Sequence, residues 1–210
     1  GAYFNIQKTG TNASADVISG VTAVCFKSDF GPLNKAVELS ADDDYTEIFG
    51  NGGTTDAIQE VINGGAKTII ACRTGNGGTA AMITLNNKES EEAVTLTASY
   101  PGKKEFTVTV REKLTDSTVK ECIIYADTTE YEKVEFAVGE NEAEALVNAF
   151  AKSKKFKAEL KAGKGTSTML NVLQSKFIPG TDPQVTTGDY SNAFSEIEAF
   201  DFNTICVDTE

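Results

Sequence analysis

The 210-residue chain contains no histidine and no tryptophan, and its only arginines are Arg73 and Arg111. Without histidine, Ser-His-Asp and Cys-His catalysis are excluded, and the commonest metal ligand is missing. The absence of tryptophan disfavours sites that bind sugars by aromatic stacking. Nineteen basic residues against 31 acidic ones give a net charge of −12. Because phosphate binding draws on clustered Lys and Arg, we expect no direct nucleic-acid partner and no anionic membrane partner.

Long hydrophobic runs are also missing, and none approaches the roughly 18–20 residues of a membrane-spanning helix. The cysteines form no C-x-x-C pair, and each lies in a short apolar run. We interpret them as buried free thiols, which suits a reducing compartment such as the cytoplasm. They are Cys25, Cys72, Cys122 and Cys206. We therefore expect no metal, no cofactor and no enzymatic activity.

The segment with the most mechanistic content is Gly65–Ala80, in which an apolar strand over Lys67–Cys72 leads into a glycine-rich turn. The turn Gly75–Ala80 fits the spacing G-x-G-x-x-A, which in dinucleotide-binding enzymes holds a pyrophosphate at the start of a helix. Ala81–Leu85 is too short for that helix and its composition favours a strand. We therefore interpret the turn as a junction between domains, with a nucleotide-binding enzyme domain as the alternative.

Before this turn the pattern is that of an α/β domain. A strand is expected at residues 17–26, and a helix is expected from the cap Ser40 to residue 49, with Asp42–Asp44 in its first turn. The alternative for these acids is a metal site, but they lack the alternation and the distal glutamate of an EF-hand loop. A second helix is expected at residues 56–63, capped by Thr54 or Thr55.

After the turn the sequence becomes rich in alternating segments, at residues 93–99, 106–111, 120–126 and 132–138. Turn residues separate them, which predicts a small β-sandwich or barrel. A helix is expected at residues 141–153. The basic segment Lys152–Lys164 is interpreted as a solvated surface. A last helix over residues 189–199, capped by Thr187, is followed by a strand at residues 202–207.

These patterns predict an α+β multidomain fold. An α/β core is interrupted by an inserted small β-sandwich, followed by a small α+β segment and the start of a further α/β domain. The expected boundaries are 1–82 for an N-terminal arm and α/β domain, 83–139 for the inserted sandwich, 140–180 for a small α+β domain, and 181–210 for the start of a C-terminal core domain that is truncated at Glu210.

The sequence resembles the tail sheath protein of contractile-tailed bacteriophages and phage-like particles along most of its length. The resemblance begins with GAYFNIQ, similar to the family's PG-x-Y start, and continues in GVTAVCFKSDFGPLNKAVEL, EIFGNGG and GGAKTIIACRTGNGGTAA. TASYPGK resembles the turn at the head of the family's inserted domain. TTGDYSNAFSEIEAFDFNTICV is similar to its DY-x-x-AL-x-x-LE-x-x-D-x-x-x-I segment.

This resemblance implies a structural subunit with an α/β core and inserted outer domains. Such subunits stack as hexameric rings around a tail tube, and contraction of their helical lattice drives the tube through the host envelope. The implied partners are further copies of the chain, the tube, and baseplate and tail terminator proteins. The implied location is the virion tail or a phage-like particle, assembled in the bacterial cytoplasm. Since the family protein is about twice as long, we expect this chain alone to be monomeric or weakly associated.

The resemblance also implies extended arms at both termini that pair with sheets of neighbouring subunits. The segment Ala2–Ile6 has the length and alternation for such β-augmentation. We therefore predict a subunit interface at Tyr3, Phe4, Asn5 and Ile6. The alternative is an edge strand of the chain's own fold. An exported surface-array or adhesin β-module is a further alternative for the whole chain.

Overall fold

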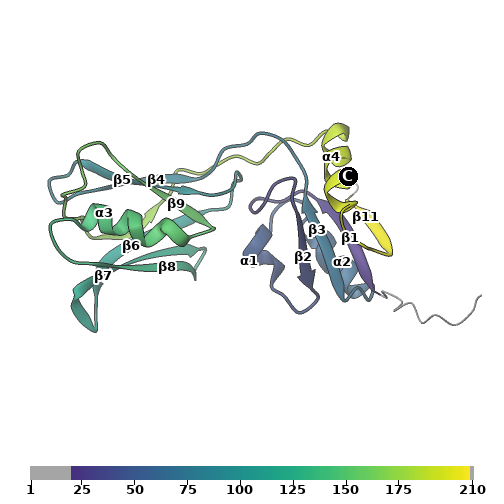
Figure 1. The fold of residues 1–210 in the computed structure, drawn as a ribbon, viewed down its shortest axis with the longest axis horizontal. Coiled ribbons are helices and arrows are strands. Elements are labelled where there is room, and N and C mark those ends of the chain that lie inside the picture. Colours follow the sequence, from purple (N-terminus) through teal and green to yellow (C-terminus); the bar gives the residue numbers. More distant parts are fainter. Residues whose placement is uncertain (1–19, 209–210) are drawn as a thin grey trace, which may run out of the picture.

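The computed structural model describes residues 20–208, which form two lobes joined by two connecting segments of the chain (Figure 1). The first lobe, here called the core lobe, contains elements from both ends of the described chain. They are β1 (Val21–Phe26), β2 (Ala36–Ser40), α1 (Tyr45–Phe49), α2 (Asp56–Asn63), β3 (Thr68–Arg73), α4 (Thr187–Ile197) and β11 (Thr204–Val207).

The core lobe has three layers. Its sheet has the order β11-β1-β3-β2, with β11, β1 and β3 parallel and β2 antiparallel. Side chains alternate between the two faces of a strand, so β1 and β3 supply both hydrophobic cores. Val24 and Ile69 pack with α1 and α2 on one face, whereas Cys25 and Ile70 pack with α4 on the other.

The second lobe, here called the insert, contains all the elements between β3 and α4. They are β4 (Met82–Asn86), β5 (Glu92–Ala98), β6 (Phe106–Lys113), β7 (Asp116–Ala126), β8 (Thr129–Ala137), α3 (Glu142–Ala149), a 3₁₀ turn (Phe150–Lys152), β9 (Phe156–Leu160) and β10 (Val172–Lys176). The antiparallel sheets β10-β6-β7-β8 and β4-β5-β9 enclose one hydrophobic core. The chain is therefore a mixed α+β protein with several sheets and few helices.

Strand pairing joins residues 140–180 to the insert, in contrast to our expectation of a separate small domain there. β9 pairs with β5, and β10 pairs with β6. The helix α3 contacts β8, β9 and β5. A lone helix with two short strands could not bury its apolar faces, and in the insert those faces complete an existing core. The boundaries at residues 82 and 181 stay predictions.

The C-terminal segment also joins an existing sheet, although we expected it to begin a further domain. β11 pairs in parallel with β1, with Ala23 opposite Ile205 and Cys25 opposite Val207. α4 begins at a capping box in which Thr186 and Asp189 exchange hydrogen bonds. The α/β pattern that stops at β3 thus resumes in the same lobe after the insert.

The first helix begins later than predicted. Ser40 was expected as its N-cap, but β2 continues through Ser40, which pairs with Thr68 of β3. Asp44 caps α1 instead, and its carboxylate accepts the backbone N–H of Thr46. Asp43 accepts the backbone N–H of Ser40. Sheet pairing has overridden a local capping preference, and two of the three acids serve the turn that follows β2.

Candidate functional site

The glycine-rich turn lies in the connector between the lobes. Residues 74–81 lead out of the core lobe and residues 178–185 lead back, and the two segments run antiparallel (Figure 1). Bridges join Asn76 to Gln184 and Thr79 to Thr181. Gly75–Ala80 is therefore one half of a two-stranded link, at the place where we predicted a domain junction.

Several N–H groups of the turn already have acceptors within the protein. The N–H of Gly75 donates to Asn34 Oδ1 at 3.2 Å, and that of Asn76 donates to the Gln184 carbonyl at 2.8 Å. The next element is the strand β4, so the turn opens no helix. A pyrophosphate cradle requires free amides at a helix N-terminus, and no helix begins at this turn.

Close approach of the two connecting segments explains the glycines. Gly78 has φ +78°, and a Cβ there would lie 2.6 Å from the Thr181 carbonyl oxygen. At Gly75, with φ +149°, a Cβ would lie 2.8 Å from Pro183 Cβ. Only glycine combines these backbone angles with contacts this short. The motif therefore allows tight pairing of the link.

An aromatic contact fixes the lobes to one another beside this link. Phe30 belongs to the loop after β1 in the core lobe, yet its buried ring packs into the core of the insert. Ring centroids lie 5.4 Å away at Tyr100, 5.5 Å at Phe106 and 5.9 Å at Tyr131, all in edge-to-face geometry. Such pairs add to the hydrophobic gain of burial. We call Phe30 and these three rings the aromatic joint.

Polar contacts strengthen the aromatic joint at Tyr131. Its hydroxyl donates to the Glu47 carbonyl of α1 at 2.5 Å, which links insert to core lobe. The ammonium groups of Lys155 and Lys104 lie 4.0 and 5.0 Å from the centre of its ring. Burial raises the pKa of Tyr131 well above its usual value, so the hydroxyl keeps its proton across the physiological range.

Arg73 holds the loop that carries Phe30. This fully buried side chain donates from Nη2 to the Ser28 carbonyl at 2.7 Å and from Nη1 to the Gly31 carbonyl at 2.8 Å. Desolvation lowers the pKa of Arg73 to about 10, while the nearby Asp182 and Asp29 carboxylates oppose that shift. Arg73 therefore remains charged at neutral pH and serves as a buried clamp.

A second polar cluster lies at the carboxyl ends of the parallel strands, where open α/β sheets usually bind ligands. Here Asp208 Oδ1 accepts the Tyr190 hydroxyl at 2.6 Å, and Oδ2 accepts the Thr54 hydroxyl. Lys27 Nζ lies 3.8 Å from the same carboxylate. These bonds tie the end of β11 to α4, to β1 and to the loop before α2. We assign the cluster a structural role.

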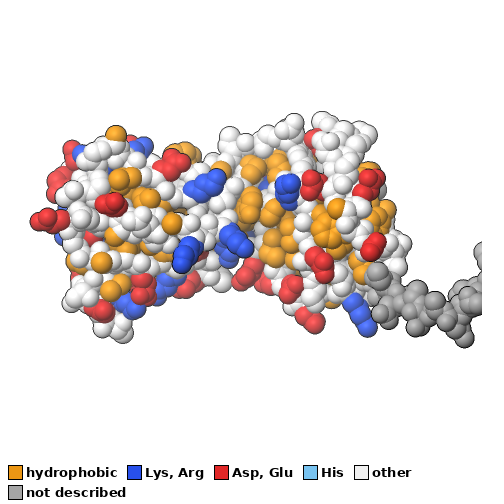
Figure 2. Space-filling view, viewed as in Figure 1, with side chains coloured by type: hydrophobic (Ala, Val, Ile, Leu, Met, Phe, Trp, Pro, Cys, Tyr) orange, Lys and Arg blue, Asp and Glu red, His pale blue; other side chains and the backbone are white. Residues whose placement is uncertain are grey.

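The predicted interface residues Tyr3, Phe4, Asn5 and Ile6 lie outside the described residues, so that interface stays a prediction. Within the described chain, β11 and β2 are the edge strands of the core-lobe sheet. β11 exposes Ile205 and Val207, and a groove of about 500 Å³ separates this strand from α2. Figure 2 shows apolar side chains reaching the surface of both lobes.

Chemistry-bearing groups are sparse across residues 20–208. No group of three or more His, Cys, Asp or Glu side chains in this range could hold a metal ion. Burial raises the pKa of the thiols of Cys25 and Cys122 to about 12 and that of Cys72 to about 11, so these are poor nucleophiles. No helix in the described part is long and apolar enough to cross a membrane.

Two features of this arrangement escaped the sequence reasoning, namely the Phe30 anchor and the Arg73 clamp. Phe30 precedes a Gly-Pro turn and reads as a loop residue. Arg73 ends a strand of buried residues, two positions before Gly75. In the sequence, Arg73 directly follows four apolar residues of a strand that was expected to be buried. This was a usable signal, because a charged side chain in such a place must find polar partners inside the protein.

Two solved structures have the same two-lobed arrangement over most of this chain. The sheath tail protein of Desulfitobacterium hafniense superimposes with a TM-score of 0.66 at 24% identity, over 98% of this chain and 45% of that protein. The sheath tail protein of Listeria innocua superimposes with a TM-score of 0.69 at 21% identity, over 89% of this chain and 39% of that protein. The chain has the fold of a phage tail sheath protein.

The likeness to the sheath fold includes both lobes, since it extends over nearly the whole chain. The chain spans less than half the length of either sheath tail protein. No family model and no curated protein matches the sequence. The resemblance read from the sequence motifs is therefore supported by the fold.

Proposed function

We propose that this chain is part of the structural subunit of a contractile phage-type tail sheath. The observation that carries the proposal is the match to two sheath tail proteins, one of which covers 98% of the chain. That coverage includes the core lobe, the two-stranded link and the insert. A likeness limited to one lobe would have supported only a common domain type.

In this proposal, subunits stack as hexameric rings around a tail tube, and contraction of the lattice drives the tube through the host envelope. The partners would be further copies of the subunit, the tube, and baseplate and tail terminator proteins. The location would be a virion tail or phage-like particle, assembled in the bacterial cytoplasm. Because the chain spans less than half of each sheath tail protein, parts outside it would contribute to these contacts.

The joint between the lobes suits a subunit that bears load. The insert is attached by two antiparallel segments of chain, by the aromatic joint and by the bond from Tyr131 to Glu47. Two covalent connections resist rotation better than one. A force applied to either lobe would then move both together.

The edge strand β11 suits the predicted arm contact. An extended segment such as Tyr3–Ile6 of another copy would add a strand to an exposed sheet edge through backbone hydrogen bonds. β11 offers such an edge with two exposed apolar side chains, Ile205 and Val207. We propose that the arm residues bind an edge of this kind in a neighbouring subunit.

Electron microscopy of the full-length protein tests the proposal. We expect helical tubes built from stacked rings. The variant Ile6→Pro, which removes a backbone donor, should shorten or abolish the tubes, whereas Ile6→Val should preserve them. A full-length protein that stays monomeric at high concentration would contradict the proposal, and so would micromolar binding of NAD or ATP in calorimetric titration.

A further inference from the structure

Three asparagines of the chain directly precede glycine, and their surroundings in the fold differ. They are Asn51, Asn63 and Asn76, and all three are exposed. An asparagine in this position can cyclise, because the backbone nitrogen of the next residue attacks the side-chain Cγ and ammonia leaves. Glycine has no Cβ to obstruct this attack. Since the three steps share the same chemistry and exposure, their hydrogen bonds decide which of them reacts first.

Asn63 is protected at the end of α2. The N–H of Gly64, which carries the attacking nitrogen, donates to the Glu60 carbonyl at 3.0 Å. Oδ1 of the Asn63 side chain also accepts Nε2 of Gln59 at 3.1 Å. Cyclisation at this step therefore requires both hydrogen bonds to break and the last turn of the helix to open, which is a local unfolding event.

Asn76 is protected within the two-stranded link. Its N–H donates to the Gln184 carbonyl at 2.8 Å, and its own carbonyl accepts the Gln184 N–H at 2.9 Å. The second of these bonds holds the peptide plane between Asn76 and Gly77. That plane must rotate to bring the Gly77 nitrogen to Cγ of Asn76, so the pairing of the link resists ring closure.

No such contact holds Asn51, which lies in the α1–α2 loop, residues 50–55. Within residues 20–208, neither the backbone nor the side chain of Asn51 makes a hydrogen bond. In the same range the N–H of Gly52 has no acceptor. The attacking nitrogen and the amide under attack can therefore meet without breaking any contact of the fold.

We propose that Asn51 is a site of spontaneous deamidation and is modified before Asn63 and Asn76. The Gly52 nitrogen loses its proton to a base in the solvent, so the rate rises with pH. Its attack forms a bond to Cγ, breaks the bond from Cγ to Nδ2 and releases ammonia, which leaves a succinimide ring. Water then opens the ring. Cleavage of the bond from nitrogen to Cγ gives aspartate, and cleavage of the bond from nitrogen to the Asn51 carbonyl carbon gives isoaspartate.

The α1–α2 loop packs too tightly to absorb either product. A Cβ at Gly52 would lie 2.8 Å from the Asp29 carboxylate, and one at Gly53 would lie 2.7 Å from the Lys27 carbonyl oxygen. Isoaspartate lengthens the backbone of this loop by one carbon. Both products add a negative charge to a loop that packs on Asp29, whose Oδ1 is buried without a hydrogen-bond partner among residues 20–208. A further like charge destabilises such a carboxylate.

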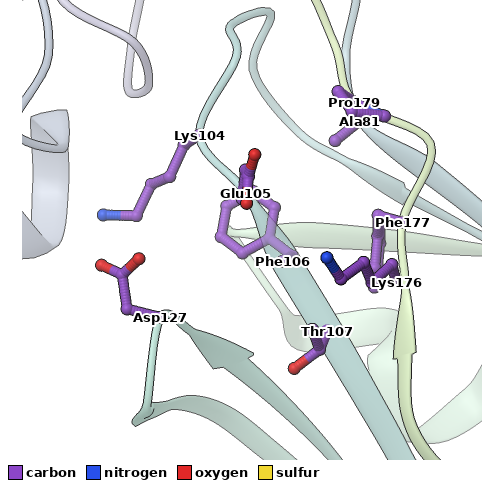
Figure 3. A pocket seen from close by; sticks show the side chains of 9 residues that line it. All are labelled: Ala81, Lys104, Glu105, Phe106, Thr107, Asp127, Lys176, Phe177 and Pro179. Atoms are coloured by element: carbon purple, nitrogen blue, oxygen red, sulfur yellow. The ribbon is translucent and has the colours of Figure 1, made fainter.

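The strain would reach the contact between the lobes, because Asp29 directly precedes Phe30 of the aromatic joint. The Asp29 carbonyl accepts the backbone N–H of Lys104 at 3.3 Å, which ties this loop to the insert. Figure 3 shows the Lys104 side chain extending from the insert toward the core lobe, where Nζ donates to the Thr46 carbonyl at 3.4 Å. Deamidation at Asn51 should therefore weaken the joint. This modification does not depend on the proposed sheath function.

Peptide mapping of the native chain during storage in mildly alkaline buffer tests the site. Mass spectrometry follows the conversion of each asparagine, and chromatography separates aspartate from isoaspartate. We expect Asn51 to convert about tenfold faster than Asn63 or Asn76, which corresponds to about 1.4 kcal/mol of protection at the other two sites. In urea the three rates should converge, because unfolding removes that protection. Equal rates in the native chain, or a lead of Asn51 that persists in urea, would overturn the inference.

The melting temperature tests the effect of the modification on the fold. It should fall in step with conversion of Asn51, and the fresh variant Asn51→Asp should already melt below the native chain. Asn51→Gln is the matched control, because a longer side chain closes a larger ring far more slowly, and it should keep its melting temperature during storage. Complete conversion of Asn51 at an unchanged melting temperature, or an equal fall in Asn51→Gln, would overturn the predicted effect on the joint.

Discussion

Replacing Phe30 with alanine tests whether the aromatic joint makes the two lobes one mechanical unit. The ring is 2% exposed and contacts three aromatic rings of the insert, although it belongs to the core lobe. Phe→Ala at a buried site costs about 3–5 kcal/mol in the free energy of unfolding. For a chain of this size, that corresponds to a fall in melting temperature of roughly 6–20 °C.

The location of the loss matters more than its size. Without Phe30 the lobes keep the two-stranded link, but they lose their shared hydrophobic contact. We therefore expect calorimetry to resolve two unfolding transitions in Phe30→Ala where the native chain shows one. Small-angle scattering should show a wider distribution of maximum dimensions. Phe30→Leu keeps most of the apolar volume and should cost less than about 1.5 kcal/mol.

Phe49→Ala is the matched control for this experiment. Phe49 is equally buried, but it packs against Phe26 within the core lobe, with ring centroids 4.9 Å apart. It should destabilise by a similar amount without releasing the insert. If Phe30→Ala unfolds in one transition and scatters like the native chain, the lobes are coupled by other contacts and the reasoning is refuted.

Three further predictions concern thiols, pH and a buried ion pair. Maleimide should label only Cys206 in the native chain, because the other three thiols are buried and burial raises their pKa values. Rapid labelling of more than one thiol would contradict this prediction. Glu121→Gln should cost about 1–2 kcal/mol at pH 7. Because the pKa of Glu121 is lowered in the fold, its carboxylate stabilises the fold above the unfolded-state pKa, and this stabilisation is lost as pH falls below that value. Urea denaturation should therefore show the difference between Glu121→Gln and the native chain shrinking as the solution is acidified. Lys120→Met should lower the free energy of unfolding by about 3–5 kcal/mol, because it leaves Glu142 buried without its cation. Lys120→Arg keeps the charge and should cost less. Equal urea midpoints for Lys120→Met and the native chain would refute this prediction.

The pH prediction rests on two cations that face Glu121. Lys133 Nζ lies 2.7 Å from Oε2, and Arg111 Nε lies 2.6 Å from Oε1. Hydrogen bonds from Lys133 and then from Arg111 lower the pKa of the carboxyl, and its desolvation opposes them. Arg111 and Glu121 also lie on the two strands of the β6–β7 hairpin, so a drop in pH should loosen the end of this hairpin before it unfolds the insert.

Local patterns predicted the elements of this fold well wherever one segment decides its own structure. The alternation in FTVTVR and KECIIYA corresponds to β6 and β7, which pair across a short turn. The strand before the glycines was predicted from its apolar run and is β3. Hairpins and single amphipathic segments need only neighbouring residues to specify them.

The sequence analysis failed where pairing spans long separations. β5 and β9 pair across about 60 intervening residues, and the sequence of neither segment indicates which strand it pairs with. The basic segment Lys152–Lys164 was interpreted as solvated surface, yet Phe156 within it is fully buried and begins β9. The alternation in FKAEL was a usable signal, but the lysines around it masked the pattern.

The same limitation applies at the domain boundary that we expected at residue 140. Lys120 reads as the polar start of a strand, and Glu142 reads as an ordinary acid in the first turn of a helix. In the fold they form a buried pair at 2.7 Å, and Glu142 also accepts the backbone N–H of Met169 at 2.8 Å. One buried charge thus ties β7, the start of α3 and the chain before β10 together. Cutting the insert at residue 140 would separate the two charges, and each would then be exposed or unpaired at a cost that the intact insert avoids.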